Sequence, residues 1–301
     1  MRTVSVLSYT VFLACYAAAQ APAPPPVPSE SSANRVSEPL YRVTVVSRTT
    51  KAINYGHLSE PTKVGLKGTV LMTEAQGEAR VESKRGAVEI EAKISHLESP
   101  TRFGPQYLTY VLWAISPEGR PVNLGELVAD PSDKAKIKVS TDLQAFALIV
   151  TAEPYFSVMQ PSDAVVMENV VQPGTLGRIQ EVDAKYELLP RGHFTYDPGT
   201  QASAHAATKV SMSEYEALVA TYQAQNAIQI AKAAGADKYA AGTLQKAEQL
   251  YRQAVDMQAK KPSSREIVTV AREAAQAAED ARAISMKRQE SDISAAPLPR
   301  T

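Results

Sequence analysis

The chain has 301 residues, and at about 150 residues per domain this length predicts two domains and a short remainder. Its 32 Lys and Arg residues balance 32 Asp and Glu residues, so it lacks the positive field that draws proteins onto nucleic acid or anionic membranes. Hydrophobic residues make up 44% and charged residues 21%, a composition that excludes a disordered chain. We therefore expect a folded protein that does not bind nucleic acid.

Residues 1–19 have the pattern of a secretory signal peptide. Arg2 precedes an uncharged apolar run from Val4 to Ala19, and the small residues at its end predict cleavage between Ala19 and Gln20. The run is too short and too rich in alanine for a membrane span. We expect a protein exported to the periplasm or the outer membrane.

Cys15, the single cysteine of the chain, lies inside this segment. With the preceding run Val11-Phe12-Leu13-Ala14 it resembles a bacterial lipobox, whose cysteine is lipidated and becomes the mature N-terminus. The resemblance implies a signal of residues 1–14 and membrane attachment through the lipid. The alternative is an ordinary cleaved signal that contains Cys15. In either case the folded part has no cysteine, so we expect no disulfide and no thiolate metal site.

Residues 20–37 predict a tether in front of the first domain. Prolines are concentrated between Pro22 and Pro28, and Ser, Glu and Asn residues follow them. A proline-rich segment is extended and stiff, whereas a serine-rich one is flexible, and neither supplies side chains for a core.

Residues 38–190 have the pattern of an antiparallel β domain. Short β-branched runs alternate with turn residues, and no helical period interrupts them. The expected strands are 42–47, 64–72, 79–83, 87–94, 107–115, 122–128, 136–139, 145–151 and 164–170. Strands at this spacing predict an Ig-like β-sandwich, with Trp113 as the aromatic ring of its core. The alternative for Trp113 is a ring on which a ligand stacks.

Part of this region resembles a known family. The runs Tyr110–Arg120, Asn123–Leu127 and Phe146–Pro154 are similar to the extracytoplasmic sandwich domain of anti-sigma-K-type regulators. The similarity extends over roughly residues 107–169. It implies the sandwich fold, and we carry over the fold alone because a fold does not determine a function.

Residues 208–290 predict an alanine-rich antiparallel helical hairpin or three-helix bundle, joined to the β domain by a linker at residues 191–207. Two capping boxes, Ser211 with Glu214 and Ser263 with Glu266, indicate helix starts. We expect helices from Ser211 to Gly235, from Thr243 to about Lys261, and from Ser263 onward, with a disordered tail at residues 291–301. Glu279, Asp280 and Arg282 are interpreted as exposed helix charges.

The helices carry stripes of alanine at spacings of three and four, close to the heptad repeat of a coiled coil. These stripes can pack on one another, or one alanine face can receive a helix from another envelope protein or from a second copy of the chain. The candidate interaction face is Tyr222, Ala227, Ile230, Leu250, Ala274 and Ala278.

Residues 212–288 resemble an alanine-rich helical domain of unknown function found in bacterial envelope proteins and lipoproteins. The resemblance rests on Ala231, on the run Ala234-Gly235-Ala236, on Tyr239-Ala240 and on the apolar positions from Leu244 to Ala254. It implies an exported or lipid-anchored protein.

The sequence lacks the motifs that usually carry catalysis. His57, His96, His193 and His205 lie far apart, and the chain has no Gly-x-Ser-x-Gly elbow, no Walker loop and no Gly-x-Gly-x-x-Gly motif. We therefore expect no catalytic residues, no metal and no cofactor.

Two functions remain. The first is a non-catalytic exported envelope protein that acts as a structural or protein-interaction module. The alternative is a binding module for a small molecule or a cell-wall glycan, with a site on the sandwich loops formed by Phe103, Tyr107, Tyr155 and Phe156.

Overall fold

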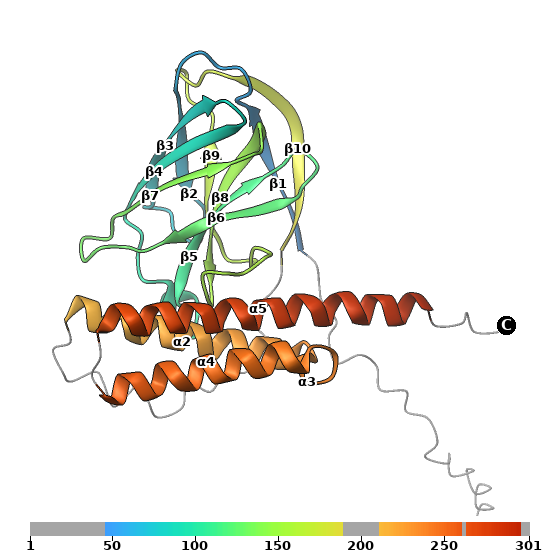
Figure 1. Cartoon of the computed structure of the whole chain (residues 1–301). Coiled ribbons are helices and arrows are strands. Elements are labelled where there is room, and N and C mark those ends of the chain that lie inside the picture. Colours follow the sequence, from blue (N-terminus) through green and yellow to red (C-terminus); the bar gives the residue numbers. More distant parts are fainter. Residues whose placement is uncertain (1–45, 189–210, 261–262, 296–301) are drawn as a thin grey trace, which may run out of the picture. The chain divides into compact units, whose positions relative to one another are not determined.

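The computed structural model describes residues 46–188, 211–260 and 263–295, in which an antiparallel β domain precedes a helical bundle (Figure 1). The strands are β1 (Val46–Asn54), β2 (Thr62–Gly68), β3 (Gln76–Lys84), β4 (Ala87–Ser95), β5 (Thr109–Ile115), β6 (Pro121–Leu127), β7 (Ala135–Thr141), β8 (Ala145–Glu153), β9 (Val165–Val170) and β10 (Arg178–Leu188). The 3₁₀ helix η1 (Pro100–Phe103) lies between β4 and β5.

Eight strands form a sheet that curls into a nearly closed barrel. Their order is β6-β5-β8-β9-β2-β3-β4-β7, and all neighbours are antiparallel. Among the described strands, β6 and β7 do not pair with each other, so a seam lies between them. Gly125 of β6 lies at this seam with a φ of 141°, and a Cβ atom there would lie 3.0 Å from Ile137 Cδ1 of β7.

The single sheet differs from the expected Ig-like sandwich of two stacked sheets. Inward and outward residues alternate along a strand in both architectures, so the sequence pattern cannot separate them. The difference lies in long-range pairing, above all between β2 and β9, which are about a hundred residues apart and join the two halves of the barrel.

Strands β1 and β10 form a two-stranded ribbon, which joins the barrel where β1 pairs with β8. β10 pairs with β1 from Val46 to Asn54, and on the other edge of β1 Ile53 and Asn54 also pair with Phe146 and Ala145 of β8. β10 was not expected from the sequence. The register of the ribbon shifts between Lys51 and Ile53, and such an irregularity interrupts the alternation by which strands are recognised.

The α-helices within the described ranges are α2 (Met212–Ala233), α3 (Ala236–Tyr239), α4 (Ala241–Lys260) and α5 (Ser264–Ala295). The capping box at the start of α2 is confirmed, because Glu214 N donates to Ser211 Oγ at 3.3 Å and Ser211 N donates to Glu214 Oε2 at 2.8 Å. Gly235 takes a φ of 78° after α2, as the expected helix end requires. The tail expected from residue 291 is helical as far as Ala295.

The two faces of β5 and β8 belong to two different apolar cores. Tyr110, Leu112 and Ala114 of β5 belong to the core inside the barrel, whereas Val111, Trp113 and Ile115 belong to a second core that the helices share. Trp113 is fully buried, as expected of a core ring, but it lies against the helices rather than inside the β domain.

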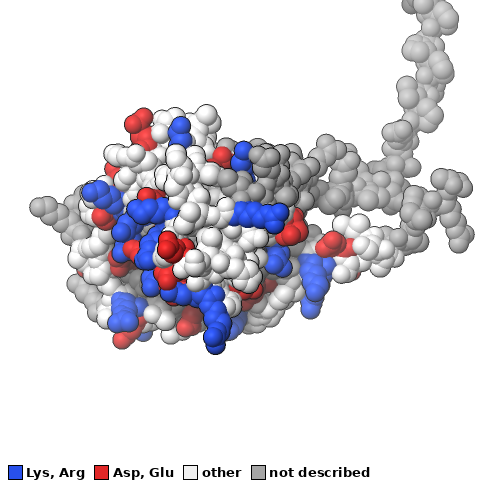
Figure 2. Space-filling view, turned by 90° about the horizontal axis from the view of Figure 1, so that it is seen from above, with Lys and Arg blue, Asp and Glu red and all other residues white. Residues whose placement is uncertain are grey.

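The view from above shows basic and acidic side chains interspersed over that face of the molecule (Figure 2). On the barrel such charges pair across strands: Lys136 Nζ lies 2.9 Å from Glu91 Oε1, and Lys63 Nζ lies 2.8 Å from Glu78 Oε1. Exposed pairs of this kind stabilise a protein little. The opposite charges interspersed on the face in Figure 2 leave no extended patch of one sign there.

Candidate functional site

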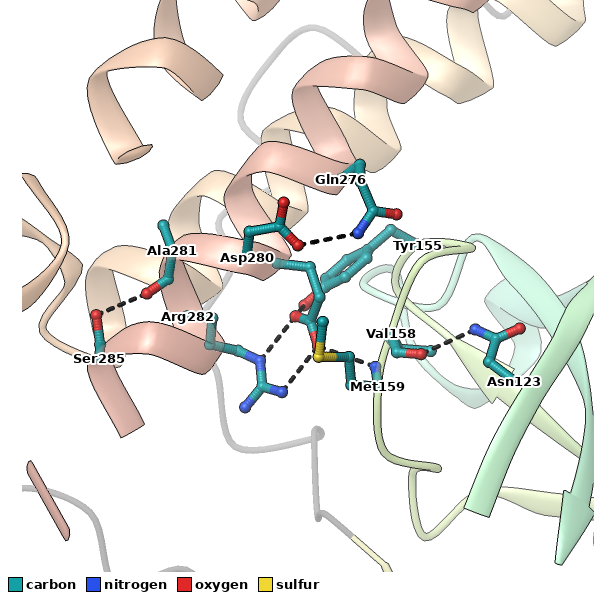
Figure 3. A network of polar contacts seen from close by, with 10 residues as sticks. Asn123, Tyr155, Val158, Met159, Gln276, Asp280, Ala281, Arg282 and Ser285 are labelled. Atoms are coloured by element: carbon teal, nitrogen blue, oxygen red, sulfur yellow. Dashed lines mark hydrogen bonds and ion pairs between the residues drawn. The ribbon is translucent and has the colours of Figure 1, made fainter. Parts of the chain in front are cut away.

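The β domain and the helical bundle meet around one buried carboxylate, that of Glu279 on α5. Tyr155, in the loop after β8, donates its hydroxyl hydrogen to Glu279 Oε2 at 2.6 Å, and Met159 N of the same loop donates to Oε1 at 2.9 Å. Figure 3 shows both loop residues pointing toward α5. The loop is held from its other side by Asn123 of β6, whose Nδ2 donates to the carbonyl oxygen of Val158 at 2.8 Å.

Arg282, one turn further along α5, completes this network. Its Nε and Nη2 donate to the two oxygens of Glu279 at 2.7 and 2.8 Å, and both residues are buried. Burial alone would lower the pKa of Arg282, but the hydrogen bonds and the charge of Glu279 outweigh burial and raise that pKa. Both residues lie on α5, so this two-point pair orients the Glu279 carboxylate, while the bonds from Tyr155 and Met159 join it to the loop.

A second polar cluster, Glu126 with its three partners, lies closer to the surface. Glu126 Oε1 of β6 accepts hydrogen bonds from Thr109 Oγ1 at 2.7 Å and Gln223 Nε2 of α2 at 2.8 Å. Glu126 Oε2 accepts from Arg272 Nη2 of α5. The guanidinium carbon of Arg272 lies 4.4 Å from the centre of the Phe156 ring, and burial lowers the pKa of Arg272. One carboxylate thus joins a strand to two helices.

Helix α2 also bonds the backbone of the β domain. Asn226 Nδ2 donates to the carbonyl oxygen of Gln106 at 3.1 Å, and Phe156 N donates to Gln223 Oε1 at 2.9 Å. These bonds satisfy loop groups that the helices remove from water, since buried polar groups need partners.

A cleft of about 570 Å³ opens beside Glu126, between the β domain and the helices. β5, β6 and the loop after β6 form one wall, and α2 and α5 form the other. The exposed fractions of three apolar side chains in its lining are high: 56% for Val128, 52% for Tyr215 and 47% for Met212. Concave sites with apolar walls and a few convergent polar groups are the usual form of small-molecule sites.

The residues of the expected interaction face lie mostly inside the shared core. Ala227, Ala274 and Ala278 are 0% exposed and Ile230 is 7% exposed, while Tyr222 and Leu250 are half-buried. The alanine stripes pack on one another and on β5 and β8. In this structure they are therefore not free to receive a helix from another chain.

The residues of the expected ligand loop do not form an open site either. Phe103 and Tyr107 pack with the core inside the barrel, whereas Tyr155 and Phe156 pack with the core shared by the helices. Tyr155 is 0% exposed, and its hydroxyl is bonded to Glu279. Cys15, Ala19 and Gln20 lie outside the described residues.

The charged residues that build both polar clusters were not expected from the sequence. Glu279 and Arg282 were interpreted as exposed helix charges, but their side chains are 0% and 9% exposed. Helical spacing could have shown this, because Glu279 lies four residues after the buried Ala275 and Arg282 lies four residues after the buried Ala278, on the same face of α5. Nothing local marks Glu126, Gln223 and Arg272, which the fold brings together from three distant segments.

No protein-family model matches the chain, and no curated protein is similar enough to count as a relative. The two family resemblances of the sequence therefore stay predictions. Within the described ranges, no helix is long and apolar enough to cross a membrane, and His, Cys, Asp and Glu side chains do not gather into a group of three that could hold a metal ion.

Proposed function

We propose that this chain is an exported, non-catalytic binding protein of the bacterial cell envelope, and that the cleft beside Glu126 is its ligand site. The observation that carries the proposal is the cleft itself, about 570 Å³ in volume, which lies within the usual range of about 300–1,000 Å³ for ligand sites. Export rests on the signal peptide predicted for residues 1–19.

The helices form one wall of the cleft and are bonded to the β domain, which forms the other. Glu126, Glu279 and Asn226 each bond across the boundary between the β domain and the helices. A site whose two walls are already joined by such bonds is preorganised, so binding does not have to form it. This arrangement favours the binding module over an interaction through the alanine face, which would require the helices to separate from the β domain.

A non-catalytic role is favoured by how the buried carboxylates are used. Both oxygens of Glu126 and of Glu279 accept hydrogen bonds that join the β domain to the helices. A general acid or base must instead be available to a substrate in the site.

A fragment-binding experiment tests the proposal. The protein purified after export would be screened for thermal stabilisation by small amphiphilic molecules, since a ligand at a hundred times its Kd should stabilise it by about 2.7 kcal/mol. Binding should be lost in V219W, which fills the cleft from α2. It should persist in V255W, a matched change on α4 outside the cleft. Ligands that bind V219W as well as the unmodified protein would refute the site.

Attachment to the membrane is a separate part of the proposal. If Cys15 is lipidated, the intact mass of the exported protein will correspond to a diacylated chain that begins at that residue. A mass that corresponds to a chain beginning at Gln20 would establish ordinary cleavage instead.

A further inference from the structure

We propose that the cleft selects small organic cations that carry an apolar group, such as arylalkylammonium ions. This inference rests on the proposed function, because it names the ligand class of the same cleft. The inference is based on the charges that line the cleft. Among the described lining residues, Arg272 is the single basic one. The acidic residues of the lining are Glu126, Asp130, Asp133 and Glu216.

The single cation is already neutralised. Arg272 donates to Glu126 Oε2, and its guanidinium covers the ring of Phe156. Both oxygens of Glu126 are occupied as well, because Thr109 and Gln223 donate to Oε1. This pair contributes no net charge to the cleft, and an anionic ligand would have to compete with Glu126 for the guanidinium.

The remaining charges of the lining are all negative. The Asp130 carboxylate accepts hydrogen bonds from Ser132 Oγ and from the backbone of residues 132 and 134; these bonds, and to a smaller extent the charge of Lys134, lower the pKa of Asp130 and keep it ionised. Asp133 and Glu216 form no ion pair with any described residue. A cleft with low-dielectric walls focuses the field of such charges, so the cleft attracts cations.

The apolar wall complements this field. Tyr215 of α2 is 52% exposed and Val128 is 56% exposed, and both line the cleft. A tyrosine ring attracts a cation placed over its face, and Val128 offers contact area to the apolar part of the same ligand. The lining therefore has a surface for each half of an amphiphilic cation.

Three probes of matched shape test the inference: phenylbutylamine, which is an ammonium ion at neutral pH, phenylbutyrate and phenylbutanol. Their dissociation constants would be measured by ligand-observed NMR with the protein purified after export. The ammonium should bind about tenfold more tightly than the carboxylate. Each carboxylate of the lining outside the Arg272–Glu126 pair attracts the ammonium and repels the carboxylate probe, and so contributes part of this factor. The alcohol should lie between them.

Charge variants give the matched control. D133N/E216Q removes two of the three negative charges that remain in the lining and should sharply reduce the preference for the ammonium over the carboxylate, of which Asp130 keeps a part. D256N/E290Q removes two charges from exposed positions of α4 and α5 outside the cleft and should leave the preference intact.

The outcomes separate this inference from the proposed function. Equal binding of all three probes, lost in V219W, would overturn the cation preference while the binding site stood. Tighter binding of phenylbutyrate would also overturn the preference. If no probe binds, or if V219W binds all three unchanged, both proposals fail.

Discussion

Replacing Arg282 by methionine should destabilise the protein by about 3–5 kcal/mol. The guanidinium makes two bonds to Glu279, and the Glu279 side chain is 0% exposed. Removing one partner of a buried pair leaves the other charge uncompensated, which costs far more than the net contribution of the intact pair. Tyr155 and Met159 still donate to the carboxylate, so the lower part of this range is expected.

Urea denaturation, monitored by tryptophan fluorescence, measures this loss of stability with a probe between the β domain and the helices. Trp113 is the single tryptophan of the chain, and it lies in the core shared by the β domain and the helices. Its fluorescence should therefore report separation of the two units. R265M, at an exposed position of the same helix, is the matched control and should change stability by about 0.5 kcal/mol or less.

A second variant tests whether the buried charge causes the loss. E279Q/R282M removes both charges, and the amide can accept from Met159 N through its oxygen and donate to the Tyr155 hydroxyl through its nitrogen, so it should recover most of the stability lost in R282M. The loss in R282M relative to the unmodified protein should also shrink as the pH falls toward about 4, because protonation removes the uncompensated charge. A loss below about 1 kcal/mol in R282M, or no recovery in the double variant, would refute the reasoning.

Three further changes test other parts of the structure by the same unfolding measurement. E126Q should cost about 1–2 kcal/mol, because Arg272 loses its ionic partner while remaining partly exposed. A278L should cost about 1–3 kcal/mol, since this fully buried alanine has no space for a larger side chain. G125A should cost about 1–3 kcal/mol, because the φ of 141° is strained for alanine and the new Cβ atom would crowd Ile137.

Each of these changes has a control at an exposed or open position. E273Q lies on the exposed face of α5, A259L lies on the exposed face of α4, and G242A introduces a Cβ atom with no neighbour within 4 Å. These controls should change stability by about 0.5 kcal/mol or less. If a control and its partner had equal effects, the contact assigned to that partner would be wrong.

The elements that the sequence predicted correctly are those with a local signature. The start of α2 was predicted from Ser211 and Glu214, and its end from Gly235, because capping depends on residues within one turn. The closure of the barrel had no such signature. It depends on the pairing of β2 with β9, and the same alternation of side chains would serve a sandwich.

The candidate site was harder to predict because it is assembled from distant segments. Glu126, Gln223 and Arg272 meet only after the helices have packed on the barrel. An acidic residue in a strand and a basic residue in a helix are common surface features, so neither indicates the other. The aromatic residues that did stand out, Tyr155 and Phe156, are used in packing.

One sequence feature did carry the information that the helices cover the barrel. All seven residues of β5 are buried, and so are eight of the nine in β8. A strand of an antiparallel sheet with one wet face alternates between apolar and polar residues, whereas an unbroken apolar run needs cover on both faces. The apolar run from Tyr110 to Ile115 therefore requires a partner outside the β domain, and the alanine-striped helices supply that apolar surface.

The cleft follows from this cover, because its two walls belong to the β domain and to the helices. A ligand bound there contacts both the β domain and the helices, so it should stabilise their association. By the same coupling, a change that weakens the association should lower the affinity of the cleft for the ligand. R282M should therefore raise the Kd of a cleft ligand although Arg282 does not line the cleft. R265M should leave the Kd unchanged. An unchanged Kd in R282M, with its stability lowered as expected, would show that the two walls keep their positions without the buried pair.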